Sequence, residues 1–192
     1  MKRKKNILVL TYWSYKDALI QAYTLPYIHI ILNVLPPGSI AYLVTVEQSQ
    51  LAMTIDEKMQ VKERLRLHGI RLITLEYRKL SPINLIYWIG SGLYLFLVAL
   101  FRRINYIHAW CTTAGSIGYI LSLVTGKKLI IDSYEPHAEA MVENQTWEKK
   151  SFQFNILFYL EKKLSGRADI LISATEKMRD YEIGRASCRE RV

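Results

Sequence analysis

Cysteine is scarce in this sequence, and the spacings that bind metals or phosphates are missing. The two cysteines are Cys111 and Cys188, and no CxxC pair occurs. The histidines lie far apart along the chain, at His29, His68, His108 and His137. Because a zinc site needs clustered cysteine or histidine ligands, we expect no metal site. The patterns GxGxxG and GxxxxGK[ST] are also absent, which argues against a dinucleotide fingerprint and a P-loop.

The C-terminal end differs from the rest of the chain. It reads EIGRASCRERV over 182–192, which resembles the translation of a common sequencing adapter, so we interpret 183–192 as an artefact. Without this tail Cys111 is the sole cysteine, which excludes an internal disulfide and favours a reducing compartment. Removing the tail's three arginines and one glutamate lowers the net charge from +9 to +7. A predicted helix that begins at 173–181 is cut off, so we expect a longer natural protein.

The remaining positive charge points to anionic partners. Nucleotide phosphates and anionic lipid headgroups are the candidates. Lysine and arginine are scattered and no recognition motif accompanies them, so nucleic acid is not expected as a partner. The basic start MKRKK leads into an apolar run of only five residues, so we expect no signal peptide.

Short apolar runs alternate with longer helical stretches along the chain. The runs that predict buried strands are 6–10, 40–46, 70–75, 106–110, 129–132 and 169–173. The predicted helices are 17–35, 54–68, 83–101, 113–125 and 151–164. Pro26 should kink or divide the first helix, and Thr54 with Glu57 forms a capping box at the second. The pattern predicts an α/β, Rossmann-like, doubly wound parallel sheet of about six strands, with helices on both faces, as one domain over 1–182.

In such a fold ligands bind beyond the carboxyl ends of the strands. The loop after the first strand contains Tyr12, Trp13, Tyr15 and Lys16 and no glycine. Its rings could stack on a sugar or on the acceptor of a transfer reaction. They could equally pack the loop against the following helix, and the sequence leaves both interpretations open.

After the fourth strand, small and hydroxyl residues open a helix. Thr112, Thr113, Gly115 and Ser116 are candidates for binding an anion or the hydroxyls of an acceptor sugar. The alternative is that Gly115 serves close packing between helix and sheet. His108, inside the strand pattern, is interpreted as a core histidine with satisfied hydrogen bonds. No basic neighbour is expected to activate Cys111 as a nucleophile.

An acidic loop follows the fifth strand. It holds Asp132, Glu135, His137 and Glu139, whose carboxylates and imidazole could bind sugar hydroxyls or transfer a proton. We favour a functional role over the alternative, in which Asp132 caps the loop and the glutamates are solvated. Trp147 is expected to pack this loop down.

The predicted helix 83–101 has no charged residue and is long enough to span a membrane. A span would put neighbouring strands on opposite sides of a bilayer, so we reject it. The helix could be a core helix of a two-domain protein, or it could dock at an anionic membrane surface, which the basic excess favours. The docking residues would be Trp88, Tyr94, Leu95, Phe96, Arg102 and Arg103. The expected location is cytoplasmic, peripheral on the inner face of the cell membrane.

The segment 129–178 resembles the second half of the acceptor domain of family 4 glycosyltransferases, which have the GT-B architecture. The resemblance rests on a strand that ends in Asp132, the acidic loop with Glu135, His137, Glu139 and Trp147, the triplet Leu160-Glu161-Lys162, the pair Ala168-Asp169, and Thr175-Glu176-Lys177-Met178. It implies catalytic roles for Asp132, Glu139, His137 and Glu135.

The resemblance also implies a function for the whole protein. The chain would be the N-terminal, acceptor-side domain of a retaining enzyme that transfers a sugar from a nucleotide sugar to a glycan or lipid-linked acceptor in surface polysaccharide synthesis. No metal or other cofactor is implied, and the donor would bind mainly to a second domain, so this chain alone should be inactive. The alternative is a stand-alone Rossmann-like module that binds a nucleotide or a partner at the membrane surface.

Overall fold

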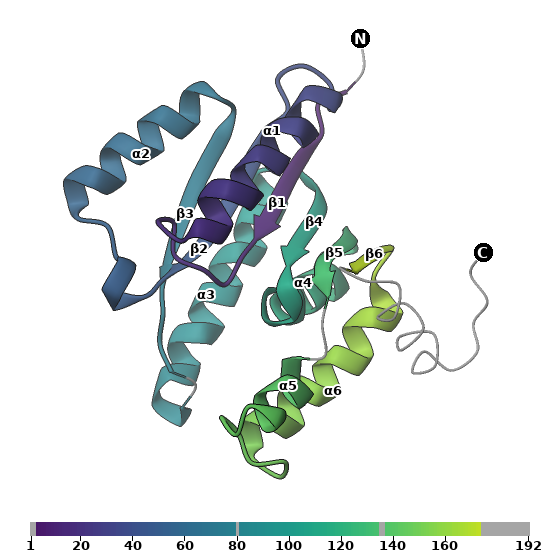
Figure 1. Cartoon of the computed structure of the whole chain (residues 1–192). Coiled ribbons are helices and arrows are strands. Elements are labelled where there is room, and N and C mark those ends of the chain that lie inside the picture. The colour runs from purple at the N-terminus through teal and green to yellow at the C-terminus, as the bar shows by residue number, and fades with distance from the viewer. Residues whose placement is uncertain (1–2, 80, 135–136, 174–192) are drawn as a thin grey trace. The chain divides into compact units, whose positions relative to one another are not determined.

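The computed structural model describes residues 3–79, 81–134 and 137–173. Its strands form one six-stranded sheet in the order β3-β2-β1-β4-β5-β6 (Figure 1). The strands are β1 (Asn6–Leu10), β2 (Ala41–Glu47), β3 (Ile70–Glu76), β4 (Ile104–Trp110), β5 (Lys128–Tyr134) and β6 (Ile170–Ser173). The pairs β1/β2, β2/β3 and β5/β6 are parallel. This strand order is that of the doubly wound fold, so the predicted fold class is confirmed.

The helices alternate with these strands. They are η1 (Leu19–Thr24, a π-helix), α1 (Leu25–Val34), η2 (Ser49–Leu51, a 3₁₀ turn), α2 (Ile55–Leu67), α3 (Pro82–Phe101), α4 (Cys111–Thr125), α5 (His137–Glu143) and α6 (Phe152–Arg167). Pro26 lies in the first turn of α1 and the π-helix precedes it. Thr24 and Leu25 keep helical backbone angles, so the hydrogen-bond pattern changes beside Pro26 but the helix is not divided there.

Two further helix ends follow from single residues. Both hydrogen bonds of the capping box between Thr54 and Glu57 are present at the start of α2. Gly69 and Gly126, which follow α2 and α4, have φ of 74° and 66°. Glycine adopts this left-handed backbone without a Cβ clash, so it ends both helices where the sequence predicts.

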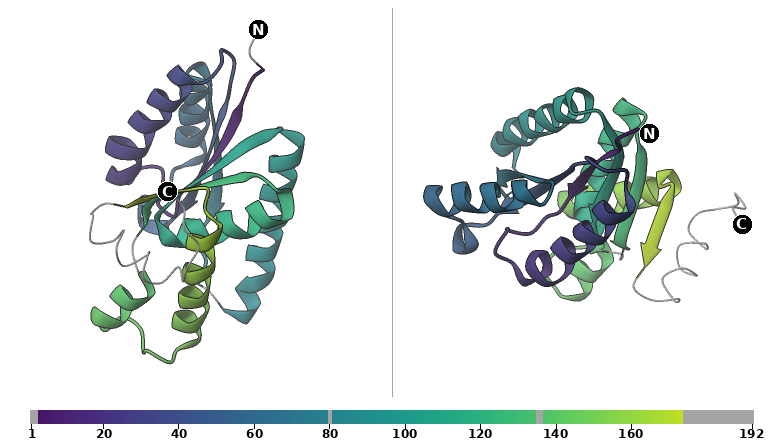
Figure 2. Two further views of the ribbon diagram at one scale, coloured as in Figure 1. Left: turned by 90° about the vertical axis from the view of Figure 1, so that its right-hand side faces the viewer. Right: turned by 90° about the horizontal axis from the view of Figure 1, so that it is seen from above.

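The chain divides into two compact units, residues 1–107 and 108–192, with the boundary inside β4. In the first unit β1 and β2 are buried almost throughout, as expected for strands covered on both faces. Helices α1 and α3 lie on opposite sides of these strands (Figure 2).

In the second unit the structure corrects the predicted acidic loop, because residues His137–Glu143 form helix α5. The buried Glu161 of α6 accepts a 2.9 Å hydrogen bond from the backbone N–H of Ala138, in the first turn of α5. Ala138 also packs with Phe154 and Leu157, and Trp147 contacts this cluster as predicted. The helix is thus stabilised by contacts with α6 that lie far from it in sequence.

Candidate functional site

The loop after β1 is fastened to the end of β2 by backbone hydrogen bonds. The N–H of Thr11 donates to the carbonyl of Val44, and the N–H of Val46 donates to that of Trp13, both at 3.1 Å. The N–H of Gln48 donates to the Ser14 hydroxyl at 2.8 Å. A loop without glycine is therefore held in place by its neighbouring strand.

The aromatic residues of this loop have different environments. Tyr15 is only 3% exposed, its N–H donates to Glu47 Oε1 at 3.2 Å, and Arg64 donates to its hydroxyl at 3.3 Å. Tyr15 therefore packs the loop, which favours the packing interpretation over stacking on an acceptor for this residue. Tyr12, which meets Tyr77 edge to face at 6.0 Å, is half-buried, and so is Trp13. These two rings keep a surface that a ligand could contact.

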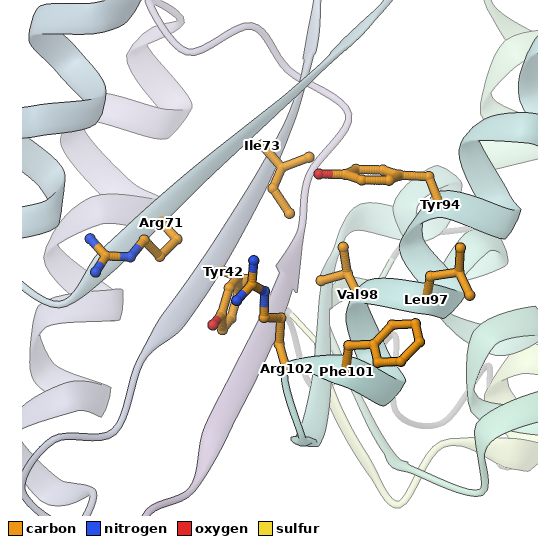
Figure 3. Close-up of a pocket in the computed structure, with 8 residues that line it drawn as sticks. All are labelled: Tyr42, Arg71, Ile73, Tyr94, Leu97, Val98, Phe101 and Arg102. Carbon is orange, nitrogen blue, oxygen red and sulfur yellow. The ribbon is translucent and has the colours of Figure 1, made fainter.

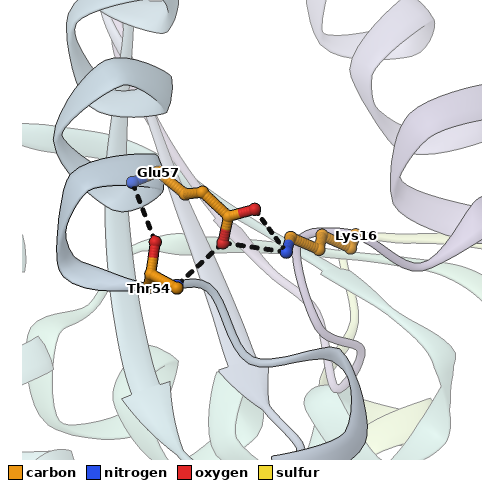
Figure 4. A network of polar contacts seen from close by, with 3 residues as sticks. All are labelled: Lys16, Thr54 and Glu57. Carbon is orange, nitrogen blue, oxygen red and sulfur yellow. Dashed lines mark hydrogen bonds and ion pairs between the residues drawn. The ribbon is translucent and has the colours of Figure 1, made fainter.

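Lys16 joins this loop to α2 rather than standing free for an acceptor. Its Nζ lies 2.8 and 2.9 Å from the two carboxylate oxygens of Glu57, which also belongs to the capping box with Thr54 (Figure 4). The hydrogen bond from Lys16, followed by that from the Thr54 N–H, lowers the pKa of Glu57 below its ordinary 4.5. This network orders the loop at the surface.

Glu47, the last residue of β2, is a candidate that the sequence analysis missed. Its Oε1 accepts the Thr45 hydroxyl at 2.6 Å as well as the Tyr15 N–H. Its Oε2 is buried and has no hydrogen-bond partner within the described residues. A glutamate that ends an otherwise apolar strand was the available clue, because strand ends carry ligand-binding residues in this fold.

In the second unit Asp132 of β5 and His108 of β4 form a buried pair. His108 Nε2 lies 3.5 Å from Asp132 Oδ2, and Asp132 is only 3% exposed. Asp132 is thus inside the fold rather than open at its edge, which corrects the predicted position. His108 is buried, as the sequence predicts for a core histidine, but neither of its ring nitrogens has a hydrogen bond to the described residues, so the prediction that its hydrogen bonds are satisfied is not confirmed. An imidazole beside a carboxylate can orient that carboxylate and exchange a proton with it.

The junction between β4 and α4 adopts an unusual backbone. Cys111, the first residue of α4, has φ of 68°, a left-handed value that is costly for a residue with a side chain. The hydroxyl residues that follow are mostly enclosed: Thr112 and Ser116 are buried, and the Ser116 hydroxyl donates to the Thr112 carbonyl at 3.1 Å. Their burial argues against the predicted contact with an acceptor, which stays a prediction, whereas Thr113 is only half-buried.

Gly115 is buried against neighbouring elements, although the contact distances there do not require a glycine. A Cβ added there would lie 3.6 Å from side-chain atoms of Ile131 and Leu164, which is ordinary contact distance. The glycine therefore lies between α4, the sheet and α6, and not at a ligand-facing surface.

Two of the remaining predicted catalytic residues, His137 and Glu139, lie on α5. His137 and Glu139 are half-buried, and the His137 ring meets that of Trp147 at 6.2 Å. Glu135 and the motif Thr175-Glu176-Lys177-Met178 lie outside the described residues, as do residues 183–192. Within 3–79, 81–134 and 137–173, no group of three metal-ligating side chains occurs.

Helix α3 is long and apolar enough to cross a membrane. Only 22% of its apolar 18-residue stretch is buried within the protein. Two of its predicted docking residues are held by the fold: Leu95 is 1% exposed, and the Trp88 indole N–H donates to the Arg78 carbonyl at 3.0 Å. Leu95 therefore cannot face lipid, which corrects that prediction. Tyr94 is exposed, Phe96 is half-buried, and Arg102 and Arg103 are exposed at the end of the helix.

Two solved structures share this fold at low sequence identity. One is a protein of Listeria monocytogenes assigned as a UDP-N-acetylglucosamine 2-epimerase, with a TM-score of 0.58 and 11% identity over 97% of this chain and 44% of the other. The second is HepE of Anabaena in complex with UDP and glucose, with a TM-score of 0.58 and 12% identity over 97% of this chain and 42% of the other. The chain thus spans less than half the length of either structure. No protein-family model and no curated protein matches the sequence.

Proposed function

We propose that this chain is the acceptor-side half of a two-domain glycosyltransferase that takes its sugar from a nucleotide sugar. The observation that carries the proposal is the match of nearly the whole chain to less than half of two structures, one bound to UDP and glucose and one assigned to a UDP-sugar. The segment 129–173 supports it, since Asp132, Glu161 and Asp169 occupy the positions that resemble family 4 glycosyltransferases.

The donor would bind mainly to a second domain, and this chain would position the acceptor. Tyr12, Trp13 and Thr113 retain exposed surface for a glycan or lipid-linked acceptor. In this proposal Glu139 and the pair of Asp132 with His108 supply the acidic and basic groups that bind the acceptor's hydroxyls or exchange a proton with them. The proposal includes transfer with retention at the anomeric carbon and without a required metal. It also includes a role in surface polysaccharide synthesis at the cytoplasmic face of the membrane.

The test compares this chain with the complete natural protein. Both are incubated with a panel of UDP-sugars and a membrane extract, and incorporation of labelled sugar into extractable product is followed. We expect transfer by the complete protein and none by the chain alone, because the reaction needs both domains. Equal rates from both would contradict the proposal. Tight binding of UDP by the chain alone, without transfer by the complete protein, would favour a stand-alone nucleotide-binding module.

A further inference from the structure

A cavity of 650 Å³ lies between α3 and the strands β2 and β3, within the range of about 300–1,000 Å³ typical of small-molecule sites. It is lined by Tyr42, Arg71, Ile73, Tyr94, Leu97, Val98, Phe101 and Arg102 (Figure 3). Tyr42 and Arg71 are the second residues of β2 and β3. The groove therefore lies at the amino ends of these strands, opposite to the edge that carries Glu47.

The lining combines an apolar wall with positive charge. Ile73 faces Tyr94, Leu97 and Val98 across the groove, and the Arg102 side chain extends toward Tyr42 (Figure 3). Within the part of the chain that the structure describes, no ion pair or hydrogen bond holds the Arg102 guanidinium. No carboxylate lines the groove.

A second arginine, Arg71, lines the groove only with part of its side chain. Its aliphatic stem lines the cavity while its guanidinium points away from Arg102 (Figure 3). Its Nη1 is buried and has no hydrogen-bond partner among the described residues. The Arg71 guanidinium instead lies close enough to Glu63 of α2 to add, after the hydrogen bond from Arg66, to the lowering of the pKa of that carboxylate. Arg102 therefore supplies the positive charge at the groove.

We propose that this groove binds one acyl chain of an anionic phospholipid, with the phosphate at Arg102. A free phosphate or sugar phosphate would leave the apolar wall without a partner, whereas a neutral lipid would leave the guanidinium without one. The groove is also continuous with exposed apolar residues of α3, because Leu97 and Phe101 belong both to the lining and to the exposed surface. A lipid could therefore enter from a membrane on which α3 rests.

The headgroup is tested with short-chain lipids that stay monomeric. Binding of dihexanoylphosphatidic acid, dihexanoylphosphatidylcholine and inorganic phosphate to the purified chain is measured by titration calorimetry. We expect phosphatidic acid to bind at least ~10-fold more tightly than either other ligand, since only it pairs with both the charge and the apolar wall. Arg102→Gln should abolish this preference. Arg103→Gln, an equal loss of charge at an exposed neighbour outside the groove, should leave it within about twofold.

The acyl chain is tested by filling the groove. Leu97 and Leu100 are 40% and 44% exposed, and Leu97 lines the groove, whereas Leu100 does not. Leu97→Trp should weaken phosphatidic acid binding at least ~10-fold and Leu100→Trp should not, with unchanged melting curves showing that both variants fold. Inorganic phosphate that binds as tightly as phosphatidic acid, or equal losses in the two arginine variants, would overturn the proposal. Absence of binding by the wild-type chain to all three ligands would also overturn it.

Discussion

At the scale of single residues, the pair of Asp132 and His108 is the main feature that the sequence did not predict. The sequence placed Asp132 at the end of a strand and His108 inside another, but it carries no information on the register between β4 and β5. The structure brings the two side chains to 3.5 Å in a buried environment, where water does not screen their interaction. A buried carboxylate whose neighbour is an imidazole is a better candidate for chemistry than a solvated one.

In the proposed two-domain enzyme, Asp132→Asn should lower kcat/KM for sugar transfer at least ~10-fold, because the variant keeps the shape of the side chain and loses its charge. Glu139→Gln should do the same if α5 faces the acceptor. Glu143→Gln, on an exposed position of the same helix, is the control and should leave the rate within about twofold. Wild-type rates for Asp132→Asn and Glu139→Gln would assign both residues to structural roles.

The Lys16–Glu57 ion pair predicts a pH dependence. The pKa of Glu57 is lowered from 4.5 by the hydrogen bond from Lys16, so folding favours the ionised carboxylate. The stabilisation is present above pH 4.5 and is lost as the pH falls through the lowered pKa of the folded protein. Lys16→Met should therefore lower the melting temperature slightly at about pH 7, and the difference from the wild type should be smaller at about pH 3.

The control is Lys62→Met, which removes an equal charge from an exposed position of α2. A melting-temperature difference for Lys16→Met that is the same at both pH values would show that Lys16 acts through packing of its stem and not through Glu57.

At the scale of elements, the strands were the most predictable part of the fold. Their buried apolar runs are local in sequence, and β1 occupies the predicted residues 6–10. Helix α5 was not predicted because it has only seven residues and its first turn is capped by Glu161, 23 positions after Ala138. A helix this short is not stable by propensity alone, so its sequence does not predict it.

Glu161→Ala should destabilise the protein by about 1–3 kcal/mol, because it leaves the buried N–H of Ala138 without an acceptor. Glu161→Gln keeps a carbonyl oxygen of the same reach and should cost clearly less. Urea denaturation followed by circular dichroism measures both. Equal stability of the alanine variant and the wild type would show that α5 does not depend on this contact.

Gly115 inside α4 and Gly126 directly after it give a matched pair of predictions. Gly115→Ala should raise the free energy of unfolding by about 0.5–1 kcal/mol, since alanine favours a helix interior and its Cβ meets Ile131 and Leu164 only at ordinary distance. Gly126→Ala should lower it by about 1–2 kcal/mol, because its φ of 66° is left-handed. If Gly115→Ala instead leaves stability unchanged and reduces transfer by the complete enzyme, then Gly115 faces the acceptor.

At the scale of the whole molecule, α3 presents two faces. Ser91, Leu95 and Ala99 recur at intervals of four and are buried. The opposite face exposes large apolar residues, namely Ile86, Ile89, Leu93 and Leu100. The outer face of a helix in water normally carries polar residues. An apolar outer face therefore indicates a surface that binds a partner. The sequence predicted an apolar helix, but only the structure distinguishes the side chains that face the sheet from those that do not.

The proposed partner of this face is an anionic membrane surface, and the corrected burial pattern changes which substitutions test it. Ile86→Asp and Leu93→Asp should each reduce the fraction of protein that sediments with vesicles of phosphatidylglycerol and phosphatidylcholine about 10-fold or more, since insertion of one such side chain contributes about 1.5–3 kcal/mol. High salt should release the wild type only in part, because it screens the attraction of Arg102 and Arg103 but not apolar insertion.

Leu95→Asp should instead unfold the first unit, since it buries a charge without a partner at a position only 1% exposed. If the wild type stays in the supernatant and Ile86→Asp and Leu93→Asp change nothing, the exposed face of α3 is covered by protein and not by lipid.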